Sequence, residues 1–455
     1  MQKIFSANLL LFCSFSFSSS AIAITIESKV IDLEQGLQAA TAYSQKIESQ
    51  EQSYQSALAR GRSLRADYFP QFSLDGQYRW VDHIPSVTLP APLNKTVEMG
   101  NHSNYSAGIN LHYLVTDFGQ TSKGIDSAKA EAEAERENKR LSADELTLSL
   151  KKVYYKLIFQ TSQLRSLLDA WELAHDQERD MERRFRSGSS SLLDYTTATK
   201  DTLSFKLKFL QTQTEFSFTL QDWLALTGET LAVEKLRSPL PQELSTRPKK
   251  LPSRPSLAVT FSSPTLAAST TSMRLTDFQH PSLLQLEQLK LAQKLKAESM
   301  ERSYFPRLSL GARTSLEYPD GGKKESYHQN SIFLTVSMPL WDGGKRSNLL
   351  ESTYALERSF AAKKENLTRE LQDTSRKMQQ LLLQLQEQAQ VAKEGTKDAK
   401  RLATLTYQSY LNGKTNYLQV QSANLKVLEW KTQEDSLLYA RSMALAQLEF
   451  LGEHR

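Results

Sequence analysis

Cysteine is almost absent from this chain of 455 residues, in which the only thiol is that of Cys13. That position lies in an N-terminal leader, so we expect the mature protein to carry no thiol. Disulfide scaffolds, cysteine nucleophiles and thiolate metal sites are therefore excluded. The chain also has no Gly-rich phosphate loop and no recognised nucleophile motif. We expect a protein that is not an enzyme and that needs no cofactor.

Long apolar runs are missing as well. After the leader, no stretch of about 20 apolar residues occurs, so no membrane-spanning helix is expected. The net charge of +5 is modest, and its residues alternate in sign instead of clustering as they do in a nucleic-acid footprint. Four histidines lie in or near the segments predicted as strands but lack the spacing of metal ligands: His83, His102, His112 and His328. Neither a metal nor a nucleic acid is an expected partner.

The N-terminus has the pattern of a secretory signal peptide. Lys3 precedes an apolar segment from Ile4 to Phe17, and an A-x-A site ends at Ala23. A transmembrane anchor is the alternative, but the apolar segment is short and broken by serine. We predict that residues 1–23 are removed on export. So polar an exported chain cannot form an ordinary compact globule of its length and needs an extended shape.

The chain repeats itself. Three motifs recur in its second half: Tyr68-Phe69-Pro70 as Tyr304-Phe305-Pro306, Asp117-Phe118-Gly119 as Asp342-Gly343-Gly344, and Phe185-x-x-Gly188 as Tyr410-x-x-Gly413. Over the last two of these motifs the two copies keep a constant separation of 225 residues. We therefore predict two equivalent halves, residues 24–230 and 280–455. The segment between them, 231–279, is a Pro-rich connector that contains six of the 14 prolines.

Each half predicts a long helix flanked by two shorter ones. The long helices, about 119–185 and 344–410, would each measure about 100 Å. The flanking helices of the first half, about 33–66 and 192–226, are each about half as long, so a pair placed end to end would match one long helix. The second long helix carries a heptad seam, formed by Leu356, Phe360, Leu367, Leu371, Met378 and Leu385. A soluble coiled-coil rod would fit these helices equally well.

Four segments alternate like strands with one apolar face: 72–80, 105–113, 308–313 and 332–338. Apolar alternation with aromatic ends is typical of outer-membrane barrel strands, although a soluble sandwich is the alternative. Bacterial barrels start at about eight strands, so four cannot close one, whereas three copies would supply twelve. The loop 81–103 is expected to be irregular and to lie outside the barrel. We place the helix–strand junctions at Pro70, Pro306, Asp117, Gly119, Asp342 and Gly343.

With a leader, two helix–hairpin halves, Tyr-Phe-Pro strand entries and glycine-centred turns, the chain resembles the TolC-like outer-membrane efflux channels, or outer membrane factors. The resemblance implies a mainly α fold with β, in which a long α-helical coiled-coil tunnel joins four strands per chain. A homotrimer would then form a twelve-stranded barrel in outer-membrane lipid and extend into the periplasm. It also implies a periplasmic adaptor and an inner-membrane transporter of the RND or ABC type. The implied function is a passive efflux or export conduit, gated at its periplasmic helix tips.

The resemblance assigns roles to the two turns that follow the long helices. The adaptor-docking tips correspond to Ser187, Gly188, Ser189, Asn412, Gly413 and Lys414, and the gate to Asp194, Tyr410, Gln419 and Ser422. Gln419 and Ser422 stand where well-known members place aspartates, so we expect weaker attraction of cations at the aperture. An acid in a first helical turn, such as Asp194, is also favoured by the helix dipole alone.

Two other functions stay open at this point. A structural coiled-coil surface protein would explain the heptads but not four alternating strands placed symmetrically in two halves. A type I protein-secretion channel would have the same tunnel, because a wide polar lumen makes few specific contacts with what passes. The sequence does not distinguish small molecules from proteins as the transported substrate.

Overall fold

The computed structural model describes residues 29–92, 94–229, 259–261, 280–321 and 323–452. The predicted leader and most of the predicted connector therefore lie outside the described residues. The chain divides into two units. In the smaller one, strand β1 (Lys29–Ile31) pairs in parallel with β6 (Val259–Phe261), so three residues of the connector form a strand.

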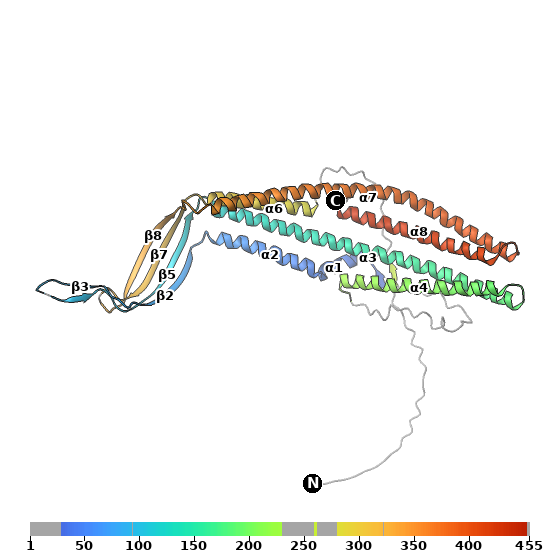
Figure 1. Cartoon of the computed structure of the whole chain (residues 1–455), viewed down its shortest axis with the longest axis horizontal. Helices are drawn as coiled ribbons and strands as arrows, with labels where there is room; N and C mark the ends of the chain where they lie inside the picture. Colours follow the sequence, from blue (N-terminus) through green and yellow to red (C-terminus); the bar gives the residue numbers. More distant parts are fainter. Residues whose placement is uncertain (1–28, 93, 230–258, 262–279, 322, 453–455) are drawn as a thin grey trace, which may run out of the picture. The chain divides into compact units, whose positions relative to one another are not determined.

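The larger unit contains both repeats (Figure 1). The first repeat comprises α1 (Leu33–Tyr43), α2 (Gln45–Ala66), β2 (Gln71–Trp80), β5 (Ser103–Thr116), α3 (Gln120–Arg186) and α4 (Leu192–Thr227). The second comprises α6 (Pro281–Arg302), β7 (Arg307–Tyr318), β8 (Tyr327–Ser337), α7 (Lys345–Leu411) and α8 (Tyr417–Phe450). The mainly α fold with β, built from two repeats, is confirmed.

Two local predictions are wrong. The segment 33–66 is not one helix, because Ser44 leaves the helical conformation and its hydroxyl accepts a hydrogen bond from the N–H of Ile47 at 3.4 Å, which starts α2. The loop 81–103 is not irregular, since β3 (Ser86–Thr88) pairs with β4 (Thr96–Glu98) in a small antiparallel hairpin.

The short helices lie in tandem along the long ones, as expected. Helix α3 contacts α2 and α6 near its start and α4 near its end, and α7 contacts first α6 and then α8 (Figure 1). Lys139 of α3 reaches Glu51 of α2 at 2.7 Å, and Lys123 reaches Glu298 of α6 at 2.6 Å. Because α3 has neighbours on two sides, its buried residues in this part include many alanines, which allow close approach of the helices.

The predicted heptad seam holds over only part of α7. Leu371 and Leu385 are buried, and Leu367 and Met378 pack beside them against residues that include Leu448 of α8. Leu356 is 48% exposed, so the seam does not extend to it. The helix is in contact with α6 there through the buried Thr353, whose hydroxyl lies 3.5 Å from the sulfur of Met300.

The two hairpins join into one antiparallel sheet in the order β2-β5-β7-β8. Registered neighbours share one apolar face, on which Leu111 pairs with Ala312 and Ala312 with Ile332. Large side chains on this face are exposed: Phe72, Leu74, Tyr78, Trp80, Ile109, Ile332, Leu334 and Val336. On the polar face, Arg313 binds Asp75 at 3.0 Å and thereby links the two repeats.

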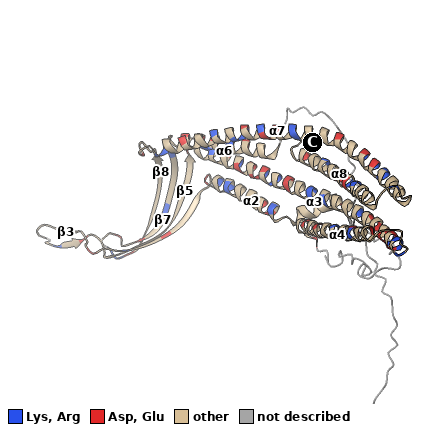
Figure 2. Cartoon of the chain, turned by 45° about the vertical axis from the view of Figure 1, so that its right-hand side comes forward, with Lys and Arg blue, Asp and Glu red and all other residues tan. Residues whose placement is uncertain are grey.

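Charge is distributed differently in the helices and the sheet. Figure 2 shows Lys and Arg interspersed with Asp and Glu along α3 and α7, whereas the four long strands carry few charges. Most helix ion pairs join residues three or four apart on one helix, as Arg369 and Glu365 do on α7. The helices thus have solvated faces of mixed sign.

Two helical glycines are expected to respond oppositely to alanine. A Cβ at Gly36 would lie 2.4 Å from the ring of the buried Trp223, whereas one at Gly61 would be 3.8 Å from Ala128. Gly36→Ala should lower the free energy of unfolding by about 1–3 kcal/mol through overpacking. Gly61→Ala should raise it by about 0.5–1 kcal/mol, because alanine is the better helix former. Thermal unfolding followed by circular dichroism measures both, and a shift of equal sign would contradict the packing at Trp223.

Candidate gate and docking site at the helical turns

The turn between α3 and α4 is closed by its own backbone. Gly188 has a φ of +75°, and its N–H donates to the carbonyl of Phe185 at 3.0 Å. The hydroxyls of Ser187 and Ser189 lie 2.8 Å apart. Ser191 caps α4 by accepting a bond from the N–H of Asp194 at 3.1 Å. This left-handed glycine satisfies the end of one helix and leaves the tip of the turn to small side chains.

The turn between α7 and α8 repeats this geometry. Gly413 has a φ of +71°, its N–H donates to the carbonyl of Tyr410 at 2.9 Å, and the N–H of Lys414 donates to that of Ser409. Asn416 is the cap and accepts a bond from the N–H of Gln419 at 3.1 Å. A Cβ at either Gly188 or Gly413 would meet nothing within 4 Å, so both tips are open to an approaching surface.

The helix–strand junctions are also built alike. Asp117 accepts from the N–H groups of Gly119 and Thr121, and Asp342 from those of Gly344 and Arg346. Each carboxylate thus satisfies free donors at the start of a long helix. The structure places Pro70 and Pro306 directly before β2 and β7, at the ends of the turns that follow α2 and α6. Gly343, with a φ of +67°, lies in the connection from β8 to α7.

Near the turns, side chains of the two helix pairs meet in a small core. Met181 of α3, Ala198 of α4 and both Tyr417 and Val420 of α8 are buried together, with Tyr407 and Tyr410 of α7 packed against them. The core is apolar at its centre and ringed by hydroxyl groups. It joins the pair α3–α4 to the pair α7–α8 just before the chain reverses.

Hydrogen bonds reinforce this contact. The hydroxyl of Tyr407 donates to Asp180 at 2.9 Å. Gln177 accepts from Tyr417 at 3.3 Å and from Asn424 at 3.0 Å. Burial, the bond to Asp180 and that residue's charge raise the pKa of Tyr407 to about 12, so the phenol stays protonated and remains a donor. We call these three bonds the inter-pair ties.

The four residues predicted for the gate are not joined to one another in the chain. The Tyr410 hydroxyl donates to the sulfur of Met181 at 3.0 Å, whereas the carboxylate of Asp194 accepts from Ser190 at 3.4 Å. Ser422 is exposed, and Gln419 makes its bond to Asn416 through its backbone. Their role in gating stays a prediction.

A comparison with models of known protein families shows which family the chain belongs to. The model of the outer membrane efflux protein family matches residues 36–229 and 278–452. The chain belongs to this family. Its members are outer-membrane efflux channels of tripartite systems, so the outer-membrane, channel and efflux character expected from the sequence is confirmed at this level.

Solved structures of such channels have the same fold. CusC matches with a TM-score of 0.74 at 17% identity, over 92% of this chain and 91% of its own. VceC of Vibrio cholerae matches with a TM-score of 0.72 at 14% identity, over 92% of this chain and 96% of its own. The CmeC outer membrane channel of Campylobacter jejuni matches with a TM-score of 0.72 at 13% identity, over 92% of this chain and 85% of its own. A comparison with curated proteins finds no significant match.

Two further properties of this outer membrane efflux protein concern the residues that the structure describes. Among them, no helix combines the length and the apolar character needed to cross a membrane. In the same part of the chain, no group of three or more His, Cys, Asp or Glu side chains is arranged to hold a metal ion.

Sequence reasoning missed the residues of the inter-pair ties. Tyr407, Tyr410 and Tyr417 lie within a short stretch around the second turn, and this concentration of tyrosines was the available signal. No sequence signal marks Gln177 or Asp180, because each is one of many polar residues on a solvated helix. A pairing between helices far apart in sequence cannot be read from either helix alone.

The buried Asp201 of α4 gives a pH-dependent prediction. It accepts a hydrogen bond from Gln421 of α8, and burial raises the pKa of its carboxyl above the ordinary value. At neutral pH the folded protein therefore holds a charge that burial disfavours, and this cost disappears as the pH falls through the raised pKa. Asp201→Asn should raise the thermal midpoint at pH 7 by about 1–3 °C. The gain should shrink towards pH 4.

Asp435→Asn is the matched control for this measurement. Asp435 is also buried but binds Lys431 at 2.8 Å and Ser162 at 2.7 Å, so its carboxylate is compensated. Loss of that charge should lower the midpoint at pH 7. A gain for Asp201→Asn that is independent of pH would contradict the role given to its charge.

Proposed function

We propose that three copies of this chain form an outer-membrane channel that continues into a periplasmic tunnel. It would carry substrates onward from a periplasmic adaptor and an inner-membrane transporter of the RND or ABC type. The energy would come from the transporter, so the protein itself is a passive conduit. Membership of the outer membrane efflux protein family supports this arrangement. The predicted signal peptide would direct the chain to the periplasm.

One observation carries the proposal: the sheet is apolar on a face that nothing in the described chain covers. Ile332 is 81% exposed and Leu74 is 80% exposed, although both are large and apolar. Exposure of such a face to water is unfavourable, whereas its exposure to lipid is not. The outer strands β2 and β8 also leave an edge of unpaired backbone groups, which lipid does not tolerate. Pairing of β2 with β8 of a neighbouring copy would remove both edges.

The turns are the proposed contact with the adaptor. Ser187, Gly188 and Ser189 form one tip, and Asn412, Gly413 and Lys414 form the other. Both tips have a left-handed glycine with open space above it, and both carry polar groups that can bind a partner's backbone. A second helical hairpin could therefore approach closely at either turn.

The gate would lie beside these tips. The inter-pair ties hold α7 and α8 against α3, so breaking them would free the tip of one pair from the other. Asp194, Tyr410, Gln419 and Ser422 would line or adjust the aperture once three copies surround it. Since Gln419 and Ser422 are uncharged, one ring of Asp194 carboxylates would remain there, and we expect only weak attraction of cations.

Reconstitution tests the proposed function. Purified protein added to a planar lipid bilayer should produce discrete conductance steps, and chemical cross-linking in detergent should stop at the trimer. A protein that remains monomeric in detergent, or that leaves the bilayer silent, would contradict the channel. Whether small molecules or proteins pass is a separate question, answered by the drug susceptibility of a strain that lacks the gene.

A further inference from the structure

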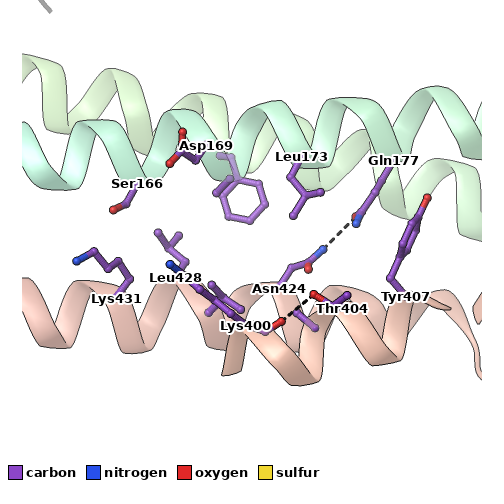
Figure 3. A pocket seen from close by; sticks show the side chains of 14 residues that line it. Ser166, Asp169, Leu173, Gln177, Lys400, Thr404, Tyr407, Asn424, Leu428 and Lys431 are labelled. Atoms are coloured by element: carbon purple, nitrogen blue, oxygen red, sulfur yellow. Dashed lines mark hydrogen bonds between the residues drawn. The ribbon is translucent and has the colours of Figure 1, made fainter. Parts of the chain in front are cut away.

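A cavity of about 500 Å³ separates the two helix pairs before they meet in the small core around Met181 and Tyr417 near the turns. Its walls come from α3 and α4 on one side and from α7 and α8 on the other (Figure 3). Along α3 it extends from Ser166 to Gln177. The volume falls in the range of about 300–1,000 Å³ that is typical of small-molecule pockets.

Bonds at both ends hold this cavity open. At one end, Ser162 of α3 donates to Asp435 of α8 at 2.7 Å. At the other, Asn424 of α8 donates to Gln177 of α3 at 3.0 Å. The helices are therefore fixed on both sides of the gap, and the gap between them is preformed. A preformed site does not require a ligand to part the helices first.

The middle of the cavity is apolar. Its lining there consists of Ala170, Leu173, Phe205, Ala403, Val427 and Leu428. Leu173 is 47% exposed, which is unusual for a leucine that faces a neighbouring helix pair. Covering this surface with an apolar molecule would be favourable, at about 25 cal/mol for each Å² removed from water.

Hydrogen-bond donors gather towards one end. Ser166 of α3 lies opposite Lys431 of α8 across the gap, and Lys400 of α7 lies on the same wall as Lys431 (Figure 3). Lys431 donates to Asp435 at 2.8 Å and to Glu434 at 3.5 Å, which leaves one of its three donors. Within the described residues, Lys400 makes no side-chain ion pair. The opposing charge in the lining is Asp169, on the α3 wall.

We propose that this cavity binds an amphipathic monoanion, a drug-sized molecule with an apolar ring body and one carboxylate or sulfonate. The ring body occupies the space around Leu173 and Phe205. The acid group accepts hydrogen bonds from Lys400, Lys431 and Ser166. Binding at this site does not depend on the proposed transport function, so channel activity and ligand binding can fail independently.

Calorimetric titration of the purified full-length protein in lipid nanodiscs tests the site, with empty nanodiscs subtracted. The probe is 2-naphthalenesulfonate, and 2-naphthylmethylammonium provides the same ring with the opposite charge. The sulfonate should bind and the ammonium should bind at least several-fold more weakly. Ala403→Trp, which fills the cavity, should lower the affinity for the sulfonate by at least tenfold. Leu402→Trp, at the exposed neighbouring position on α7, should bind as the original protein does.

Charge variants keep the test decisive if Ala403→Trp does not fold. Lys400→Gln should lower the affinity for the sulfonate by about fivefold, since it removes one charged donor at a partly exposed site. Asp169→Asn should raise this affinity, because the opposing carboxylate is gone. Equal or tighter binding of the ammonium probe would overturn the proposal. So would the absence of sulfonate binding, or unchanged affinity in both Ala403→Trp and Lys400→Gln.

Discussion

Removing the inter-pair ties should open the proposed channel. In the double variant Tyr407→Phe and Gln177→Ala, the bonds of Tyr407 to Asp180 and of Tyr417 and Asn424 to Gln177 are all lost. Each such bond contributes about 0.5–1.5 kcal/mol net, so the closed arrangement of each subunit would lose about 1.5–4.5 kcal/mol. That is enough to raise the open fraction by about tenfold or more. Single-channel recording in planar bilayers would detect larger or longer conducting states.

A second tyrosine of α7 supplies the control. The hydroxyl of Tyr354 donates to Glu301 at 2.6 Å, but this bond joins α7 to α6 near the strands, far along the helix from the turns. Tyr354→Phe removes the same chemical group and should leave conductance unchanged. If Tyr407→Phe and Tyr354→Phe behave alike, the ties do not hold the gate.

The pair Tyr410→Phe and Asp194→Ala should have a smaller effect. Within the chain, Tyr410 donates only to a thioether sulfur, which is a weak acceptor, and Asp194 is held by Ser190 and Ser191 of its own turn. These substitutions therefore remove little that joins the two helix pairs. A rise in conductance larger than that of the double variant at Tyr407 and Gln177 would show that contacts between subunits dominate the closed state.

Much of the architecture could be predicted from the sequence because it depends on local chemistry. Period-two alternation fixes which residues of β2 share a face with Leu74, and that assignment is correct. Glycine after a helix, as at Gly188 and Gly413, marks a turn that only a left-handed residue closes well. Proline at positions 70 and 306 cannot continue a helix, so the strands begin directly after them.

What could not be predicted depends on contacts between distant segments. The sequence around Gln177 shows a polar helical residue but not that Asn424, on another helix, lies beside it. The break at Ser44 was missed because serine is tolerated within a helix, and only its capping bond shows that a new helix starts there. The hairpin of β3 and β4 was hidden by the prolines around it. Each of its strands has only three residues, too few for alternation to be evident.

The second large effect concerns two adjacent positions of β8. Leu334 belongs to the apolar face, pairs with Leu310 and is 63% exposed, whereas Thr335 pairs with Ser309 on the polar face. Leu334→Arg should cost about 2–4 kcal/mol if the residue lies near the middle of the membrane. Thr335→Arg should cost almost nothing, because the polar face would line a water-filled lumen. Heat-modifiable trimer in outer-membrane fractions, compared on gels with and without boiling, measures the difference.

The strength of this pair lies in what the two variants share. They add the same side chain to neighbouring residues of one edge strand, so charge, helix content and export signal are equal. Only the face of the sheet differs. Loss of trimer in Leu334→Arg alone would place the apolar face in lipid. Equal loss in both variants would mean that the strand tolerates no arginine on either face, and equal tolerance would mean that the apolar face does not meet lipid. Either result would mean that the exposed apolar face no longer supports a barrel in lipid.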